Sequence, residues 1–178
     1  MLPEVDLGVG RPDILLLSAS GKALKARARS GLRLTNLTEA RILAALNNGA
    51  GSGHSLSHVR AVTARLQEAG WVRSTGEVRP VRRMIGDSLL VEAKVSDWRT
   101  GIQQLTRVRW ASHSSVLLMP IVSQQRVPRK TLRHNRLGLL VLDDRGLRWQ
   151  LKPPRRSLSW LADVWLTELA IRSLGAED

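Results

Sequence analysis

Two charged residues, Glu92 and Lys94, are separated by one residue inside the apolar run from Leu89 to Val95. If this run is a strand, both side chains point to the same face, because residues i and i+2 of a strand share a face. A buried charged pair is costly unless it has partners or a task. A carboxylate can hold Mg²⁺ beside a phosphodiester, and a neighbouring ammonium can orient or deprotonate the attacking water. The pair therefore points to metal-dependent phosphodiester hydrolysis.

The charge of the chain indicates a polyanionic partner. Its 178 residues carry a formal net charge of +13, and cysteine is absent. Without cysteine there is no disulfide, zinc–thiolate site or thiol nucleophile, so we expect a cytoplasmic protein. No apolar run is long enough to span a bilayer, so no membrane partner is expected. The expected partner is DNA.

Basic residues concentrate in two stretches, 22–33 and 126–156. The first can be read as a solvated basic arm or as an arm that contacts phosphates, and we expect the second to contact the DNA backbone. Two arginines of a predicted helix over 55–69 join them. The candidate DNA-binding residues are Arg60, Arg65, Arg126, Arg129, Lys130, Arg133 and Arg136.

The elements that would position Glu92 and Lys94 follow a regular order. Gly86-Asp87 has the composition of a hairpin turn, which would join a strand over 78–85 to the strand over 89–95. Asp97 caps a predicted helix over 98–112, and a buried strand over 116–122 follows. With the helix over 55–69 and a short strand over 71–73, the order is αβββαβ, in the α/β class. Further elements are predicted over 38–46, 128–135, 137–142, 147–151 and 157–174, whereas residues 1–20 are expected to be irregular.

The stretch LLVEAKVSDWRTGIQQLT, from Leu89 to Thr106, resembles the strand, E-x-K motif and following helix of the PD-(D/E)xK nuclease superfamily, notably its junction-resolvase-like members. The resemblance covers residues 55–155. It implies a restriction-endonuclease-like core, a DNA substrate, and Mg²⁺ or Mn²⁺ bound by Glu92. Relatives carry a glutamine of the following helix in the site, which indicates Gln104 first and Gln103 second.

The family also needs an acidic residue on the strand before E-x-K. Glu77 and Asp87 are the candidates for this catalytic and metal-binding role, although a hairpin about Gly86-Asp87 would set Glu92 opposite Val81. Glu77 would need a register slip or a bulge, and Asp87 is more simply a turn residue. If neither completes the site, the chain is a catalytically inactive DNA-binding protein or transcriptional regulator that keeps the nuclease fold. A module that binds RNA or an acidic protein is a third reading.

The domain division expected from these elements falls after residue 54. Residues 1–54 would form the basic arm and a small helical part, and residues 55–178 the nuclease-like core with its C-terminal helix. The stretch 36–85 can also be read as a winged helix, with two helices followed by a strand–turn–strand wing. It would be a degenerate one, because only a short Gly-rich segment separates the two helices. The last helix is apolar nearly all round, which favours either a homodimer interface or a cap over the sheet.

Overall fold

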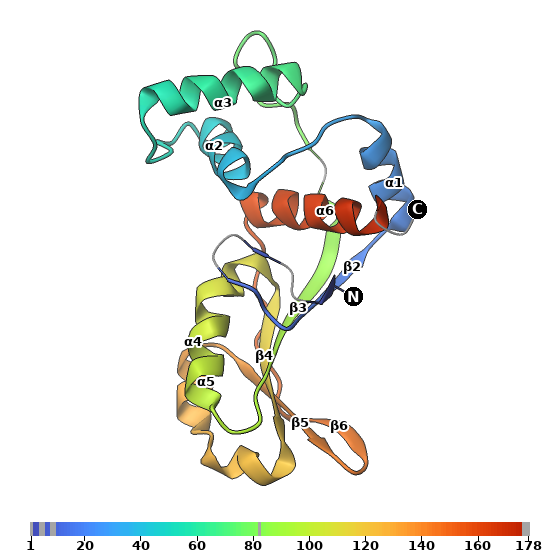
Figure 1. Cartoon of the computed structure of the whole chain (residues 1–178), viewed down its shortest axis with the longest axis vertical. Helices are drawn as coiled ribbons and strands as arrows, with labels where there is room; N and C mark the ends of the chain where they lie inside the picture. The colour runs from blue at the N-terminus through green and yellow to red at the C-terminus, as the bar shows by residue number, and fades with distance from the viewer. Residues whose placement is uncertain (1, 4–5, 8–9, 82, 176–178) are drawn as a thin grey trace. The chain divides into compact units, whose positions relative to one another are not determined.

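The computed structural model describes residues 2–3, 6–7, 10–81 and 83–175 (Figure 1). The chain divides into two compact units, and both are discontinuous in sequence. Unit 1 comprises Met1–Ser18 and Asp87–Leu158, and unit 2 comprises Ala19–Gly86 and Ser159–Asp178. This division differs from the one expected after residue 54. The helical segment interrupts the sequence of unit 1, and the C-terminal helix belongs to unit 2.

Unit 1 is built on a mixed β-sheet, so the expected α/β class is confirmed. Among the described residues its strands are adjacent in chain order, from β1 to β6. β3, β4 and β5 are parallel to one another, whereas β1 pairs with β2, and β5 with β6, in antiparallel fashion. The strands are β1 (Leu2–Pro3), β2 (Ile14–Ala19), β3 (Ile85–Ala93), β4 (Ser114–Pro120), β5 (Gly138–Asp143) and β6 (Gly146–Leu151).

The helix between β3 and β4 is α4 (Trp98–Val108), and it packs against β4 (Figure 1). The Asp97 side chain accepts a hydrogen bond from the Thr100 backbone N–H, which satisfies one of the free donors at the first turn. Ile102 and Leu105 are buried, so the helix turns its apolar face to the sheet. After η1 (Arg109–Ala111) and β4 come η2 (Ile121–Arg126) and α5 (Arg129–His134), as predicted for 128–135.

The strand meander predicted before Glu92 is wrong. Gly86 and Asp87 lie inside β3 instead of in a hairpin turn. In place of the strands predicted over 71–73 and 78–85, the described residues before β3 form an isolated antiparallel bridge between Val72 and Val78. The Ser88 side chain fixes the start of β3, since its hydroxyl oxygen accepts from the His113 backbone N–H at 2.9 Å. That contact holds β3 beside β4 from its first residues.

The strand that lies beside β3 in place of the predicted meander is β2, from the segment expected to be irregular. Its apolar residues explain the pairing. Leu15 is completely buried, and Ile14 packs against Val91 and Val116 of the neighbouring strands. The apolar run at 14–17 is therefore a strand of the sheet that places Leu15 in the core. It could be read as irregular only while its pairing partner far along the chain was unknown.

Unit 2 is helical. The predicted helices over 38–46 and 55–69 are confirmed, but the stretch expected to be a basic arm is also a helix, and it buries Arg27. α6 packs against α1 and α2, so its apolar character is accounted for within the chain. No helix among the described residues has the length and apolar content needed to cross a membrane. The helices are α1 (Gly21–Arg29), α2 (Leu37–Asn48), α3 (Leu56–Glu68) and α6 (Trp160–Gly175).

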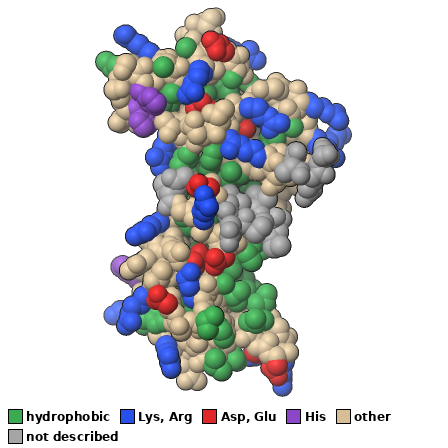
Figure 2. All heavy atoms as spheres, viewed as in Figure 1, with side chains coloured by type: hydrophobic (Ala, Val, Ile, Leu, Met, Phe, Trp, Pro, Cys, Tyr) green, Lys and Arg blue, Asp and Glu red, His purple; other side chains and the backbone are tan. Residues whose placement is uncertain are grey.

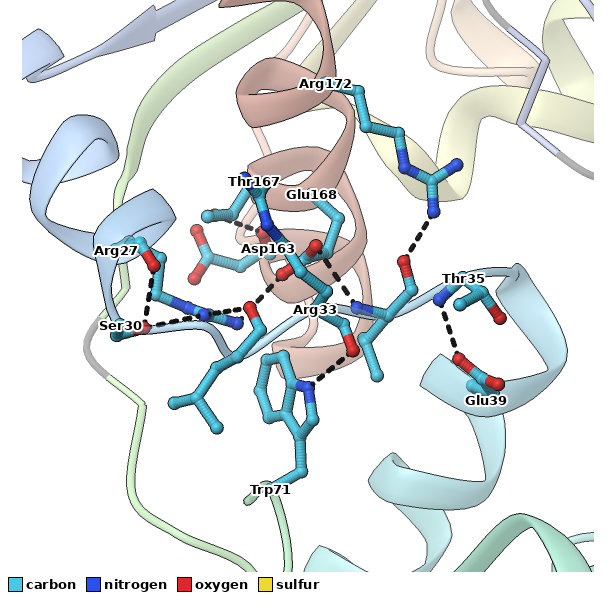
Figure 3. Close-up of polar contacts among 12 residues, drawn as sticks. Arg27, Ser30, Arg33, Thr35, Glu39, Trp71, Asp163, Thr167, Glu168 and Arg172 are labelled. Carbon is cyan, nitrogen blue, oxygen red and sulfur yellow. Dashed lines mark hydrogen bonds and ion pairs between the residues drawn. The ribbon is translucent and has the colours of Figure 1, made fainter. Parts of the chain in front are cut away.

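A buried polar network joins these helices (Figure 3). Arg27 Nη2 lies 2.8 Å from Glu168 Oε1, and Glu168 Oε2 accepts from the Leu34 backbone N–H at 3.2 Å. The Trp71 indole lies under the Arg27 guanidinium, 4.3 Å from it, and donates its N–H to the Arg33 carbonyl. The network therefore ties α1 and the segment that follows it to α6.

Candidate active site

Glu92 and Lys94 form a close ion pair near the carboxyl end of β3. Lys94 Nζ lies 2.7 Å from Glu92 Oε1, and the Glu92 side chain is 1% exposed. Apart from this contact with Lys94, neither Glu92 oxygen has a hydrogen-bond donor among the described residues. Burial raises the pKa of Glu92, and the Lys94 ammonium opposes that rise. The carboxylate thus keeps acceptor capacity that the protein itself leaves unused.

Lys94 keeps its proton. Hydrogen bonding with the Glu92 carboxylate raises the pKa of Lys94, and this outweighs partial burial, which lowers it. At neutral pH the side chain is an ammonium, so it can donate hydrogen bonds and offset anionic charge. In this state of the protein it is not a base.

A second carboxylate reaches the same place from the N-terminal segment. Asp13 Oδ2 accepts a hydrogen bond from the Ala93 backbone N–H at 2.7 Å. Because Ala93 stands between Glu92 and Lys94, this bond brings the Asp13 carboxylate to the segment that carries both. Its negative charge raises the pKa of Glu92 and of Lys94, after the larger effects given above. Asp13 directly precedes β2, which neighbours β3 in the sheet. The sheet therefore brings together two carboxylates and one ammonium.

A cavity of about 130 Å³ opens beside Glu92. Gln104 of α4 lines it, and its side-chain oxygen is buried without a hydrogen-bond partner among the described residues. Arg11 and Arg107 supply positive charge to the wall, and both are exposed. The cavity thus joins unpartnered oxygens to cationic side chains, which suits a metal ion together with a phosphate.

Within the part of the chain that the structure describes, no three His, Asp or Glu side chains gather into a group able to hold a metal ion. The available donors are instead the carboxylates of Asp13 and Glu92 and the amide oxygen of Gln104. Mg²⁺ tolerates such a set, because it usually keeps several waters and takes only one or two carboxylates. The residues present therefore fit Mg²⁺ or Mn²⁺.

The other two acids considered from sequence lie elsewhere. Asp87 stands near the start of β3, where it lies 3.4 Å from His113 Nδ1 and 3.7 Å from Arg155 Nε. At about 3.3 Å per strand residue, roughly 16 Å separates it from Glu92. Glu77 belongs to unit 2 and pairs with Arg73 on the surface. Asp87, Glu77 and Asp13 all lie outside the lining of the cavity beside Glu92, and Asp13 differs from the other two in its hydrogen bond to Ala93.

The basic residues expected to bind DNA are mostly solvent-facing. Arg126, Arg129, Lys130, Arg133 and Arg136 are exposed around η2 and α5. On α3, Arg60 is exposed and Arg65 pairs with Glu39 at 3.2 Å. Lys and Arg side chains are spread over the visible face of the molecule (Figure 2). The surface is therefore broadly cationic, and the exposed arginines remain candidates for phosphate contact.

Comparison with known proteins adds little to this geometry. No family model and no curated protein matches the chain. Among solved structures, a protein of unknown function from Silicibacter pomeroyi is similar at 16% identity, with a TM-score of 0.36, over 56% of this chain and 70% of that one. A similarity of this size carries no argument about fold or activity.

Sequence reasoning missed three residues of the site, Arg11, Asp13 and Arg107. A signal for Asp13 existed, since Pro12-Asp13 directly precedes the apolar run Ile14–Leu17. An acidic residue that directly precedes a buried strand is a candidate metal ligand, however far it lies in sequence from the other ligands. The arginines carry no such signal, because they become distinctive only through the cavity that they line.

Gly101 of α4 allows the helix to approach the charged pair closely. A Cβ at this position would lie 2.6 Å from Leu117 Cδ1 and 3.0 Å from Lys94 Cγ. We expect Gly101→Ala to destabilise the protein by about 1–3 kcal/mol through overpacking, despite a helix-propensity gain of about 1 kcal/mol. Urea unfolding measures the change. Gln103→Ala, at an exposed position of the same helix, is the matched control and should leave stability almost unchanged.

Proposed function

We propose that the chain is a metal-dependent DNA endonuclease of the PD-(D/E)xK kind, with Asp13, Glu92 and Lys94 as its central residues. The observation that carries the proposal is the position of Asp13. Its carboxylate is hydrogen-bonded to Ala93, between the two charged residues of the E-x-K motif. Under this proposal Asp13 is the acid that the family resemblance requires, and it comes from far earlier in the chain, directly before the neighbouring strand β2.

The element order supports the same proposal. β1, β2 and β3 precede α4, and β4 follows parallel to β3, which makes a βββαβ order. The helical segment of unit 2 interrupts this order between the strand that follows Asp13 and the strand that carries Glu92. Treating that segment as an insertion makes the order compatible with the proposed nuclease-type core.

The roles follow from the chemistry of each side chain. Asp13 and Glu92 would hold Mg²⁺ or Mn²⁺, with Gln104 contributing its amide oxygen. The bound ion would supply positive charge to a phosphodiester and acidify a coordinated water. Lys94, as an ammonium, donates hydrogen bonds to the attacking water or to a phosphate oxygen. Arg11 and Arg107 attract the backbone to the cavity.

Cleavage assays with Glu92→Gln and Lys94→Met test the proposal. Purified protein is incubated with supercoiled plasmid and with branched DNA in Mg²⁺ or Mn²⁺. We expect each substitution to reduce the cleavage rate by at least about a hundredfold, since Glu92→Gln removes a carboxylate that would hold the metal and Lys94→Met removes the ammonium that offsets anionic charge. Glu77→Gln is the matched control, because it removes an exposed carboxylate of the other unit.

A DNA-binding protein without cleavage is the second candidate, favoured by the small number of acids in the site. It predicts no nicking of either substrate in either metal, together with salt-sensitive binding that survives both substitutions. Equal activity of the wild type and Glu92→Gln would instead reveal a contaminating nuclease. Either result rejects the endonuclease proposal.

A further inference from the structure

Three arginines meet beyond the carboxyl end of α4, at the edge where β4 and β5 begin. Arg156 anchors the group. Its Nε donates to the Ser112 carbonyl oxygen at 2.8 Å, and its Nη2 to Ser112 Oγ at 3.2 Å and Ser115 Oγ at 3.0 Å. These neutral acceptors orient the guanidinium without neutralising it.

Arg109 and Arg136 come to Arg156 from two other elements. The Arg109 backbone carbonyl accepts from the Ser112 N–H at 3.2 Å, and its Nη1 donates to the carbonyl oxygen of Asn135, the neighbour of Arg136, at 2.8 Å. Burial lowers the pKa of Arg156 to about 10, and the positive charges of Arg109 and Arg136 contribute to the fall. Among the described residues none of the three pairs with a carboxylate.

The backbone of Arg136 is left-handed, with a φ of 56°, a conformation that favours glycine and costs free energy for a residue with a Cβ. This conformation belongs to the end of α5, where the Leu137 N–H donates to the Leu132 carbonyl oxygen at 2.9 Å. The position therefore holds a long, exposed cationic side chain where glycine would be more stable.

We propose that Arg109, Arg136 and Arg156 form a phosphate-binding site separate from the nuclease cavity. Guanidinium groups present paired donors that match phosphate oxygens, and a bound phosphate would relieve the repulsion among three uncompensated charges. The ligand chemistry is a phosphate group, and under the proposed function its source is the DNA backbone.

This site would make a second backbone contact. None of the three arginines lines the cavity beside Glu92, whereas Arg107 and Val108, which directly precede Arg109, do line it. A phosphate held by the arginines would therefore lie next to the cavity and not at Glu92 itself, so the contact would fix the register of the duplex.

Arg136→Gly separates binding from stability. A labelled 20-base-pair duplex is titrated in EDTA at several KCl concentrations, so that no cleavage is required. We expect DNA affinity to fall about tenfold and the slope of log affinity against log salt to drop by about one. The melting temperature should rise by roughly 2–4 °C, because glycine relieves the left-handed strain. Arg109→Gln should weaken binding similarly.

The control is Arg73→Gln, which removes one exposed arginine outside this basic stretch whose charge is already paired with Glu77. It should leave the salt slope unchanged. Inorganic phosphate, compared with chloride at equal ionic strength, distinguishes the two sources of ligand by its effect on the melting temperature. If Arg136→Gly and Arg109→Gln abolish stabilisation by phosphate but not DNA binding, the site takes free phosphate. If neither variant changes phosphate stabilisation or DNA binding, the proposal is overturned, whatever the cleavage assays give.

Discussion

The Asp13→Asn variant is expected to lose metal-dependent cleavage by at least about a hundredfold while folding like the wild type. Asparagine keeps the oxygen that accepts from the Ala93 N–H, so the contact that positions the side chain survives. It removes the negative charge that Asp13 places near Glu92 and Lys94. The change thus affects the metal site much more than the fold. Plasmid nicking in Mg²⁺, with circular dichroism as a folding check, measures both.

Asp87→Asn provides the comparison, because Asp87 was the alternative acid and lies at the opposite end of β3. We expect it to cleave at nearly the wild-type rate. The reverse pattern, with Asp13→Asn active and Asp87→Asn inactive, would sink the assignment of Asp13. A Mn²⁺ titration adds a readout beyond cleavage, since loss of a ligand should weaken metal binding even where DNA is absent.

Local signals in the sequence were sufficient for most helices. Asp97 accepts the backbone N–H of Thr100, three residues later, and was read as the cap of its helix. Asn36 caps α2 in the same way through the Glu39 N–H. Periodic apolar residues then set the buried faces of α2 and α4. The prediction that the Glu92 and Lys94 side chains share a face was equally local, since it follows from the two-residue period of a strand.

The sheet around the site was not predictable in the same way. β2 pairs with a strand more than sixty residues later, and no feature of either segment identifies the other as its partner. Gly86-Asp87 has the composition of a turn, so a hairpin was wrongly predicted at these residues. Once the hairpin was assumed, Pro12-Asp13 fell outside the expected core and the acid was sought at Glu77 and Asp87.

Charge was misread for a related reason. Arg27 was assigned to a solvated basic arm, yet its partner Glu168 lies 141 residues away in the chain. A basic run in sequence does not reveal which of its members finds a distant carboxylate. That pair also bears most directly on the stability of unit 2.

Glu168→Gln is expected to destabilise the protein by about 3–5 kcal/mol, measured by guanidinium unfolding. Arg27 and Glu168 have side chains 5% and 1% exposed, so loss of the carboxylate leaves a buried guanidinium without its counter-charge. Burial already lowers the pKa of Arg27 and raises that of Glu168, which means that both charges are costly to keep and depend on each other. Arg27→Met should cost a similar amount for the converse reason.

The double variant Arg27→Met/Glu168→Gln decides whether loss of the ion pair itself, or the cost of leaving one buried charge alone, dominates the destabilisation of the single variants. Because neither residue then carries a buried charge, we expect it to be clearly more stable than the sum of the two single losses implies. Arg73→Met is the control, since it breaks the exposed pair with Glu77 and should cost less than about 1 kcal/mol. Additive losses in the double variant would mean that the two side chains stabilise unit 2 independently, through their separate contacts with Leu34 and Trp71. Non-additive losses would instead make the ion pair the link between α1 and α6.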